Sequence, residues 1–261
     1  MTTAAARGPF FLVLHQARYD LLAVIRNRQA RFFTLILPVL FLLIFVGIFG
    51  NHVVHGVKLS TTYVPGLSAL GVISASFINL VISITVQREE GILKRRRATP
   101  VPAWVLIAGR TLASVVMSLA VVTVLLTVGR FVFGVTLRNA ALPGIAFTVV
   151  VGSIAFCVLG YALSTAIHSE DAAQPMVQAV MLPLYFISGI FIANSNIPRW
   201  LQHVASVFPV QHLANGLQNA YDPTQTGVGI VWTDIGVIAI WAAVGLAVAL
   251  RRFSWLPSAA S

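Results

Sequence analysis

The stretch Gln87-Arg-Glu-Glu-Gly-Ile-Leu-Lys-Arg-Arg-Arg-Ala-Thr-Pro100 (QREEGILKRRRATP) decides how this chain folds. Seven charged residues fall within positions 88–97, although only 9% of the whole chain is charged. Long apolar runs lie on both sides of it. A charged segment between such runs is typical of a loop at one membrane face, so the fold depends on whether the flanking runs span the bilayer.

The composition is that of a protein whose solvent is lipid. Hydrophobic residues make up 58% of the 261 residues and the mean hydropathy is +0.89, whereas soluble domains are about half apolar and a quarter charged. The net charge is +10, but the bases lie between apolar runs, which favours anionic lipid and argues against nucleic-acid binding. The single cysteine, Cys157, lies in an apolar run, so cysteine-based metal or redox chemistry is excluded.

Six segments are long and apolar enough to cross the hydrocarbon core as helices, which takes about 20 residues each. They are residues 32–50, 63–86, 111–133, 142–167, 173–193 and 235–250. We therefore predict an all-α polytopic membrane protein with a single transmembrane domain over residues 1–261. Membrane helices tolerate proline. Pro38 and Pro183 predict kinks, and Pro65 is expected in the first turn of the second span.

The distribution of Lys and Arg predicts the orientation of the spans. With the N-terminus inside, the inner segments carry thirteen of these bases and the outer segments carry four. Both termini and the loop 87–103 are therefore expected on the cytoplasmic side.

Two further segments are amphipathic. In residues 9–31, apolar residues such as Phe10, Leu14 and Ile25 recur at helical spacing, while Asp20 and the arginines lie largely elsewhere, which predicts a helix on the inner membrane surface. Residues 194–229 are too polar to span and too apolar for a free loop. We expect short re-entrant or interfacial helices there, with Trp200 and Tyr221 at interface depth.

Few residues suggest chemistry on this chain. A P-loop needs a Gly-Lys pair, and neither lysine, Lys58 or Lys94, follows a glycine, so the chain does not bind and hydrolyse ATP in that manner. His52 and His55 are too few for a metal site, and no metal is predicted. Asp234 precedes the last span, where a helix N-cap is favoured over a proton relay.

The second span carries polar residues on one face of its helical wheel. Ser76, Asn79 and Ser83 share this face. They either line a polar pathway or form hydrogen bonds between helices, and the pattern does not separate the two.

The quoted stretch itself predicts a short helix. Glu89 and Glu90 lie near its start, Arg95 and Arg96 near its end, and Glu90 precedes Lys94 by four residues. Prolines 100 and 102 end it. The basic residues alone could hold this loop on the cytoplasmic side by contacting anionic lipid headgroups. The acids, the glycine and the prolines are better explained by a surface for a cytoplasmic partner.

The run Gln87–Arg95, followed by Ala98-Thr-Pro-Val-Pro102, resembles the cytoplasmic loop of type-2 ABC exporter permeases. Ile197-Pro-Arg-Trp-Leu and Phe208-Pro-Val-Gln-His-Leu-Ala-Asn-Gly-Leu resemble the outer region of that family, within the daunorubicin and multidrug-resistance permease subgroup. The resemblance covers nearly the whole chain. The chain departs from it at Ile92-Leu93-Lys94, where Thr-Leu-Glu is more usual.

The resemblance implies a mechanism and partners. A separate ABC ATPase subunit, carrying the ATP and Mg²⁺, would dock at a coupling helix containing Glu89, Glu90, Gly91, Arg95 and Arg96. A second permease copy or a paralogue would complete the pathway in a bacterial plasma membrane, with membrane lipids around it. The implied function is export of a drug, lipid or glycolipid.

Two other functions remain open. An ATP-independent secondary transporter would carry an ionisable residue near the membrane midplane, and none is evident. A membrane-embedded enzyme would need convergent polar groups, whereas the six histidines are scattered.

Overall fold

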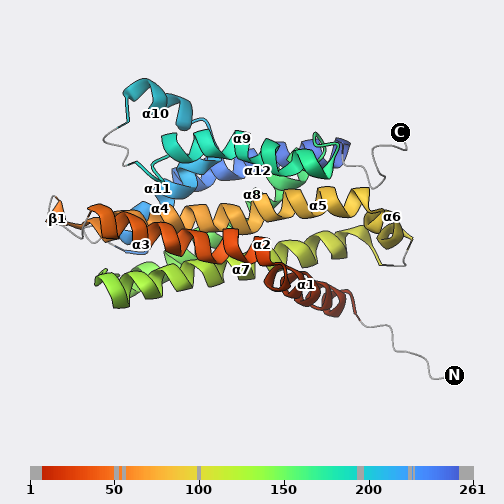
Figure 1. Ribbon diagram of the computed structural model, residues 1–261, viewed down its shortest axis with the longest axis horizontal. Helices are drawn as coiled ribbons and strands as arrows, with labels where there is room; N and C mark the ends of the chain where they lie inside the picture. The colour runs from red at the N-terminus through yellow and green to blue at the C-terminus, as the bar shows by residue number, and fades with distance from the viewer. Residues whose placement is uncertain are drawn as a thin grey trace.

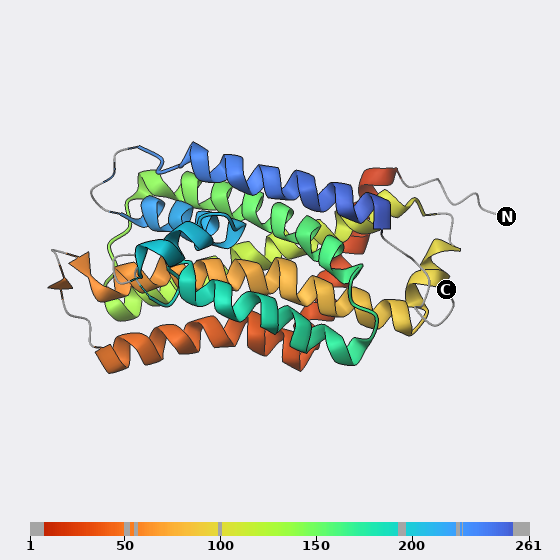
Figure 2. The same cartoon turned by 90° about the horizontal axis from the view of Figure 1, so that it is seen from above.

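The computed structural model describes residues 8–49, 53–54, 57–98, 101–192, 197–222, 225 and 227–252. Its long helices run side by side in an elongated bundle (Figure 1 and Figure 2). α1 (Pro9–Arg26), α6 (Ile92–Arg97) and the last turn of α12 (Trp232–Arg252) lie at one end, here called the α6 end. The two-residue antiparallel ladder of β1 (Val53–Val54) and β2 (Val57–Lys58) lies at the other, the β1 end.

The remaining elements follow the predicted order of spans. In the first half they are α2 (Arg28–Arg31), η1 (Phe32–Ile36), α3 (Leu37–Phe49), α4 (Leu59–Ile73), η2 (Ser74–Ile78) and α5 (Asn79–Glu89). In the second half they are α7 (Ala103–Phe133), η3 (Asn139–Ala141), α8 (Leu142–Ser164), α9 (Glu170–Ile187), α10 (Arg199–Ala205) and α11 (Pro209–Tyr221).

Five helical stretches among the described residues are long and apolar enough to cross a membrane, which confirms an all-α polytopic membrane protein. They are Arg28–Phe49, Ser60–Glu89, Ala103–Phe133, Asn139–Ser164 and Trp232–Arg252. The predicted span 173–193 corresponds to α9, which is helical but begins with Glu170 and Asp171 and also carries Gln174 and Gln178. The first half of α9 is too polar for this helix to be counted with the other five. That α9 crosses the membrane therefore stays a prediction.

Two spans contain a wide π-helical turn, in which a backbone N–H bonds five residues back rather than four. In η1 the Leu37 N–H reaches the Phe32 carbonyl, directly before Pro38. A regular helix is disturbed at that point, because proline lacks an N–H and its ring crowds the preceding turn. In η2 the Asn79 N–H reaches the Ser74 carbonyl, with no proline nearby.

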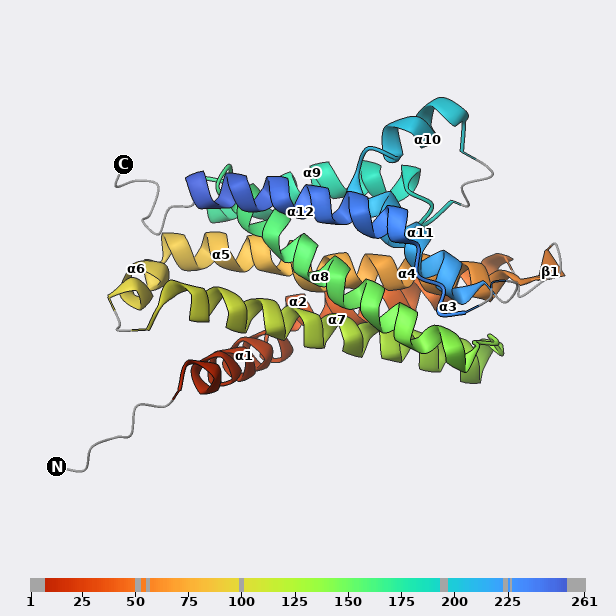
Figure 3. The same cartoon turned by 180° about the vertical axis from the view of Figure 1, so that it is seen from behind.

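The predicted interfacial helix 9–31 is two helices. The chain breaks at Asn27, whose side-chain oxygen accepts from the backbone N–H groups of Gln29 and Ala30 and so caps α2. α1 packs across α7 near the α6 end (Figure 3). Asp20, predicted on the polar side, is instead buried, and Gln16 donates to its carboxylate at 2.9 Å.

Short helices were predicted in residues 194–229, and α10 and α11 are found there, while their place at the membrane interface stays a prediction. α11 is more deeply set than expected, since it packs among α4, α8 and α12. Tyr221 is fully buried with its hydroxyl 3.5 Å from that of Ser68, so it packs inside the bundle, and its depth at the membrane interface stays a prediction. Trp200 is exposed.

Glycines allow this close packing. A Cβ on Gly144 of α8 would come within 1.9 Å of the Val228 carbonyl, and one on Gly152 within 2.6 Å of Leu213 of α11. Small residues let backbones approach in membrane proteins, where the hydrophobic effect does not drive helices together. The proline at position 65 lies inside α4 rather than in its first turn, because the helix begins at Leu59.

Candidate functional site

The quoted stretch forms a corner between two helices rather than one helix. α5 continues to Glu89, Gly91 adopts a left-handed conformation with φ 68°, and α6 starts at Ile92. The acids therefore end one helix instead of starting the next, and the predicted pairing of Glu90 with Lys94 along one helix is wrong. A residue with a Cβ disfavours positive φ, which explains the glycine at the corner.

Arg88 and Glu89 tie this corner to two other helices. The buried Arg88 guanidinium, 4% exposed, donates to the Ser164 carbonyl at 3.0 Å and to the Ile167 carbonyl. Glu89 accepts the backbone N–H of Glu170 at 2.9 Å. The cation thus meets the carbonyl end of α8 and the anion meets the amide end of α9, as the partial charges of helix ends favour. We call this arrangement the corner clamp.

α6 is held by one apolar anchor. Leu93 is 3% exposed and packs in a buried cluster with Leu80, Ile84, Cys157 and Tyr161. This cluster joins α6 to α5 and α8.

Two basic side chains of α6 point outward. Lys94 and Arg95 are exposed, as is Glu90 in the corner, while Gly91, Arg96 and Glu89 are half-buried. Of the residues predicted to meet a partner, Glu89 is already used inside the protein, and Glu90 and Arg95 are accessible. Arg88 was missed as a site residue, although a base at the end of an apolar span is a usable signal.

The three polar residues of the second span separate. Ser76 is fully buried, and its hydroxyl donates to the Val72 carbonyl of its own helix at 2.6 Å. Ser83 accepts from Arg110 of α7, which is a hydrogen bond between helices, and from Gln87 of its own helix at 3.0 Å. Asn79 alone of the three lines the large cavity described next.

A partly open cavity of about 500 Å³ lies between three walls. One wall is α2, η1 and α3, the second is α4, η2 and α5, and the third is α9. Both wide turns, η1 and η2, contribute to the lining and contact each other. Wide turns are frequent at functional sites.

The cavity lining changes along its length. The five amide residues come from the parts of the walls nearer the α6 end, and most of the aromatic residues come from parts nearer the β1 end, because α2 to α3 and α9 run toward the β1 end and α4 to α5 runs toward the α6 end (Figure 1). The amides are Asn27, Gln29, Asn79, Gln174 and Gln178. The rings are Phe41, Phe45, Tyr185, Phe186 and Phe191, with Phe33 of η1 nearer the amides. The described lining contains no Asp, Glu, Lys, Arg or His. The glutamine pair one turn apart in α9 is a sequence signal that was missed.

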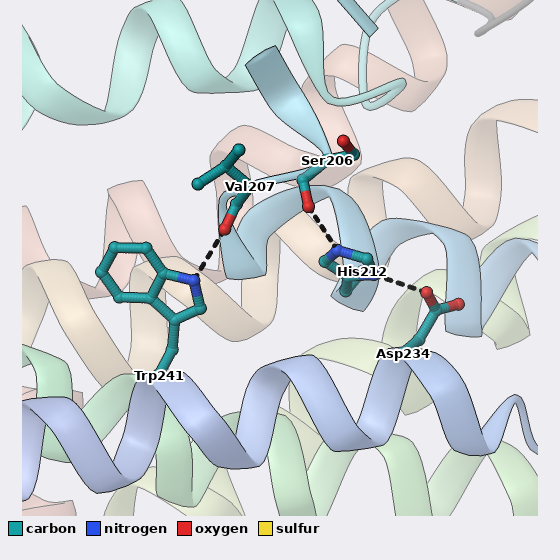
Figure 4. Close-up of polar contacts among 5 residues, drawn as sticks. All are labelled: Ser206, Val207, His212, Asp234 and Trp241. Carbon is teal, nitrogen blue, oxygen red and sulfur yellow. Dashed lines mark hydrogen bonds and ion pairs between the residues drawn. The ribbon is translucent and has the colours of Figure 1, made fainter. Parts of the chain in front are cut away.

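A second polar cluster fixes α11 to α12 near the β1 end (Figure 4). His212 Nδ1 lies 2.6 Å from the Asp234 carboxylate, and its Nε2 donates to the Ser206 carbonyl at 2.8 Å. Trp241 donates to the Val207 carbonyl at 2.7 Å. Asp234 is the third residue of α12, so it serves as a partner for His212 and not as the predicted N-cap. The histidines at 52 and 55 lie outside the described residues.

Comparison with known proteins places the chain in a family. Residues 13–221 match the family model described as ABC-2 type transporter. The chain is 23% identical over 172 residues to the "Probable multidrug ABC transporter permease YbhR" of Escherichia coli (strain K12), which covers 66% of this chain and 46% of YbhR, so it spans about half the length of that relative.

Two further relatives are covered more fully. The chain is 23% identical over 194 residues to the "Inner membrane transport permease YadH" of the same strain, covering 72% of this chain and 75% of YadH. It is 25% identical over 212 residues to the "Putative transport permease ycf38" of Porphyra purpurea, covering 78% and 73%. The family model matches most of the chain, so this protein belongs to the ABC-2 type transporter family, and its apolar helices make it a multi-pass membrane protein.

Proposed function

We propose that the chain is the permease subunit of an ABC exporter, which moves a hydrophobic or amphipathic substrate outward with ATP hydrolysed by a separate subunit. ATP and Mg²⁺ bind on that subunit, and a second permease copy or a paralogue completes the pathway. The bias of Lys and Arg supports a cytoplasmic α6 end. The absence of a Gly-Lys pair supports a separate ATPase.

The corner clamp carries the proposal. An ATPase that presses on the exposed side of α6 moves the corner at Gly91, and Leu93 prevents α6 from moving independently of the bundle. Arg88 and Glu89 connect that movement to the end of α8 and the start of α9. α9 forms one wall of the cavity. The contacts therefore supply a continuous connection from a docking surface to a candidate substrate pathway.

The test separates docking from transmission. The tagged chain is purified in mild detergent with the ATPase that accompanies it, and hydrogen exchange of residues 165–172 is measured with and without ATP. Glu89→Gln keeps an oxygen that accepts the Glu170 N–H, whereas Glu89→Ala removes it. We expect Glu89→Gln to resemble the wild type, and Glu89→Ala to keep the ATPase but lose the ATP-dependent change in exchange.

The matched control is Asp171→Ala, which removes an exposed carboxylate at the same end of the bundle. It should leave the response to ATP intact. If no ATPase accompanies the chain and transport continues without ATP, the proposal is wrong. If Glu89→Ala responds to ATP as the wild type does, the clamp does not transmit.

A further inference from the structure

Three arginines gather at the break between α1 and α2. Arg26 ends α1, while Arg28 and Arg31 begin and end α2, so three positive charges fall within six residues. All three side chains are exposed, and none forms an ion pair within the described part of the chain. Asp20, the nearest acid in sequence, is buried beside α7. This arginine cluster is therefore available to an anion from outside the bundle.

The segment that carries the arginine cluster has two faces. One face lines the large cavity, through residues such as Gln29 and Phe33. The other face is exposed and contributes nothing to that lining, and it carries Phe32, Ile36 and Leu40 after the arginines. These three residues recur every four positions along η1 and α3, and we call them the apolar row. The outer face thus joins a positive end to an apolar surface.

The apolar row is long enough for the acyl chains of one leaflet. The span Arg28–Phe49 begins at the arginine cluster, so the cluster lies where a layer of lipid headgroups is expected. Half of the hydrocarbon core is about 15 Å thick, and a helix covers that depth in about ten residues. The row from Phe32 to Leu40 has nearly this length. A phospholipid whose phosphate meets the arginines can therefore lay its chains along the row.

The charge of the arginine cluster selects among phospholipids. Guanidinium groups bind phosphate through paired hydrogen bonds, and every phospholipid offers a phosphate. A zwitterionic headgroup also carries a cation, which three arginines repel, whereas an anionic headgroup adds no such repulsion. Each basic residue near an anionic lipid surface contributes about fivefold in affinity. The cluster therefore favours a lipid of net negative charge.

We propose that the arginine cluster and the apolar row form a binding site for one anionic phospholipid per protomer, outside the cavity. The phosphate binds Arg28 and Arg31, which are three residues apart and so share a face of α2. Arg26 adds charge beside them, and the acyl chains lie along the apolar row. Binding requires neither an ATPase nor a second copy of the chain.

A second copy of the chain fits this face less well than a lipid does. A two-fold interface brings the same patch of both copies together, so it would place two arginine clusters near each other. The helical stretch Arg28–Phe49 contains no acid that could pair with them. Like charges without a partner repel, which favours the lipid as the occupant.

The experiment counts bound lipids by native mass spectrometry. The full chain in dodecyl maltoside micelles is titrated with dioleoyl-phosphatidylglycerol or with dioleoyl-phosphatidylcholine, which has the same acyl chains and no net charge. We expect one phosphatidylglycerol to bind per protomer before any further lipid, and phosphatidylcholine to bind at least about tenfold more weakly. Glycerol 3-phosphate, which has the phosphate but no acyl chains, should not displace phosphatidylglycerol at equal concentration.

Paired variants assign the binding to the arginine cluster. Arg28→Gln with Arg31→Gln should weaken phosphatidylglycerol at least about tenfold, since each base contributes about fivefold. Arg28→Lys with Arg31→Lys keeps the charge and should lose less than about fivefold. Arg251→Gln with Arg252→Gln removes the same charge from exposed residues at the same end of the bundle (Figure 1). This control should have little effect, because adjacent helix residues point about 100° apart and do not grip one phosphate together.

Several outcomes overturn the proposal. These are equal binding of the two lipids, displacement by glycerol 3-phosphate, equal losses in the two glutamine variants, or one lipid per two protomers. A high yield of disulfide between copies through Leu40→Cys in membranes would show that a second copy covers the apolar row instead. None of these results bears on the ATP-dependent exchange experiment, so the lipid site and the ATP coupling stand or fail separately.

Discussion

Replacing Arg88 by methionine tests the corner clamp most directly. Methionine has a similar length and no donors, so the carbonyls of Ser164 and Ile167 lose the guanidinium. A hydrogen bond to a charged group contributes about 1.5–3 kcal/mol, so the two bonds together predict a loss of about 3–6 kcal/mol. Arg88→Lys keeps the charge but not the fork that reaches two carbonyls, and should lose about half as much.

Two measurements check this prediction. Global stability follows from reversible unfolding in mixed micelles, monitored through the five tryptophans. Local stability follows from hydrogen exchange of residues 165–172, where the Glu170 amide should exchange faster because Glu89 is the neighbour of Arg88. Arg251→Met, an exposed base at the same end, is the control. If Arg88→Met costs less than about 1 kcal/mol, below the contribution of a single such bond, and exchange is unchanged, the clamp does not hold these helices.

Three further predictions concern two glycines and the pair of His212 with Asp234. Gly144→Ala should destabilise the bundle strongly in the same unfolding assay, while Gly47→Ala, with open space around its Cβ, should have little effect. Gly91→Ala should lower the free energy of unfolding by about 1–2 kcal/mol. There is space for a Cβ at this position, but the left-handed backbone conformation is unfavourable for alanine. His212→Leu and Asp234→Asn should each destabilise the protein, and a double-mutant cycle should show coupling of about 0.5–3 kcal/mol; additive effects would contradict a direct pair.

The apolar runs predicted most of the fold because lipid imposes a length and a polarity on any helix that crosses it. The run 63–86 became α4 to α5, and the run 111–133 became α7 with a start eight residues earlier at Ala103. The ends of the helices were less predictable, because a helix can continue beyond the apolar run from which its span was predicted. α9 shows the opposite case, since its polar first half carries the exposed Glu170 and Asp171 together with Gln174 and Gln178, which line the cavity.

The candidate site was predicted by segment but not by residue. Charge density alone located the corner, and one glycine conformation decided that Glu89 and Glu90 end a helix rather than begin one. Sequence spacing cannot show that Arg88 meets carbonyls 76 and 79 residues away. The cavity could not be predicted from the sequence either, because its walls come from distant segments that only packing brings together.

The wide turn η2 explains why Ser76 and Asn79 diverge, although a helical wheel places them together. Each residue of an α-helix advances the direction of its side chain by about 100°, and a π turn accommodates one extra residue. Everything beyond η2 is therefore out of phase with everything before it by about that angle. α4 packs against α3, α7, α11 and α8, whereas α5 packs against α8, α9 and α6. One continuous span therefore presents different faces to partly different neighbours, and no proline stands at the turn that changes its phase.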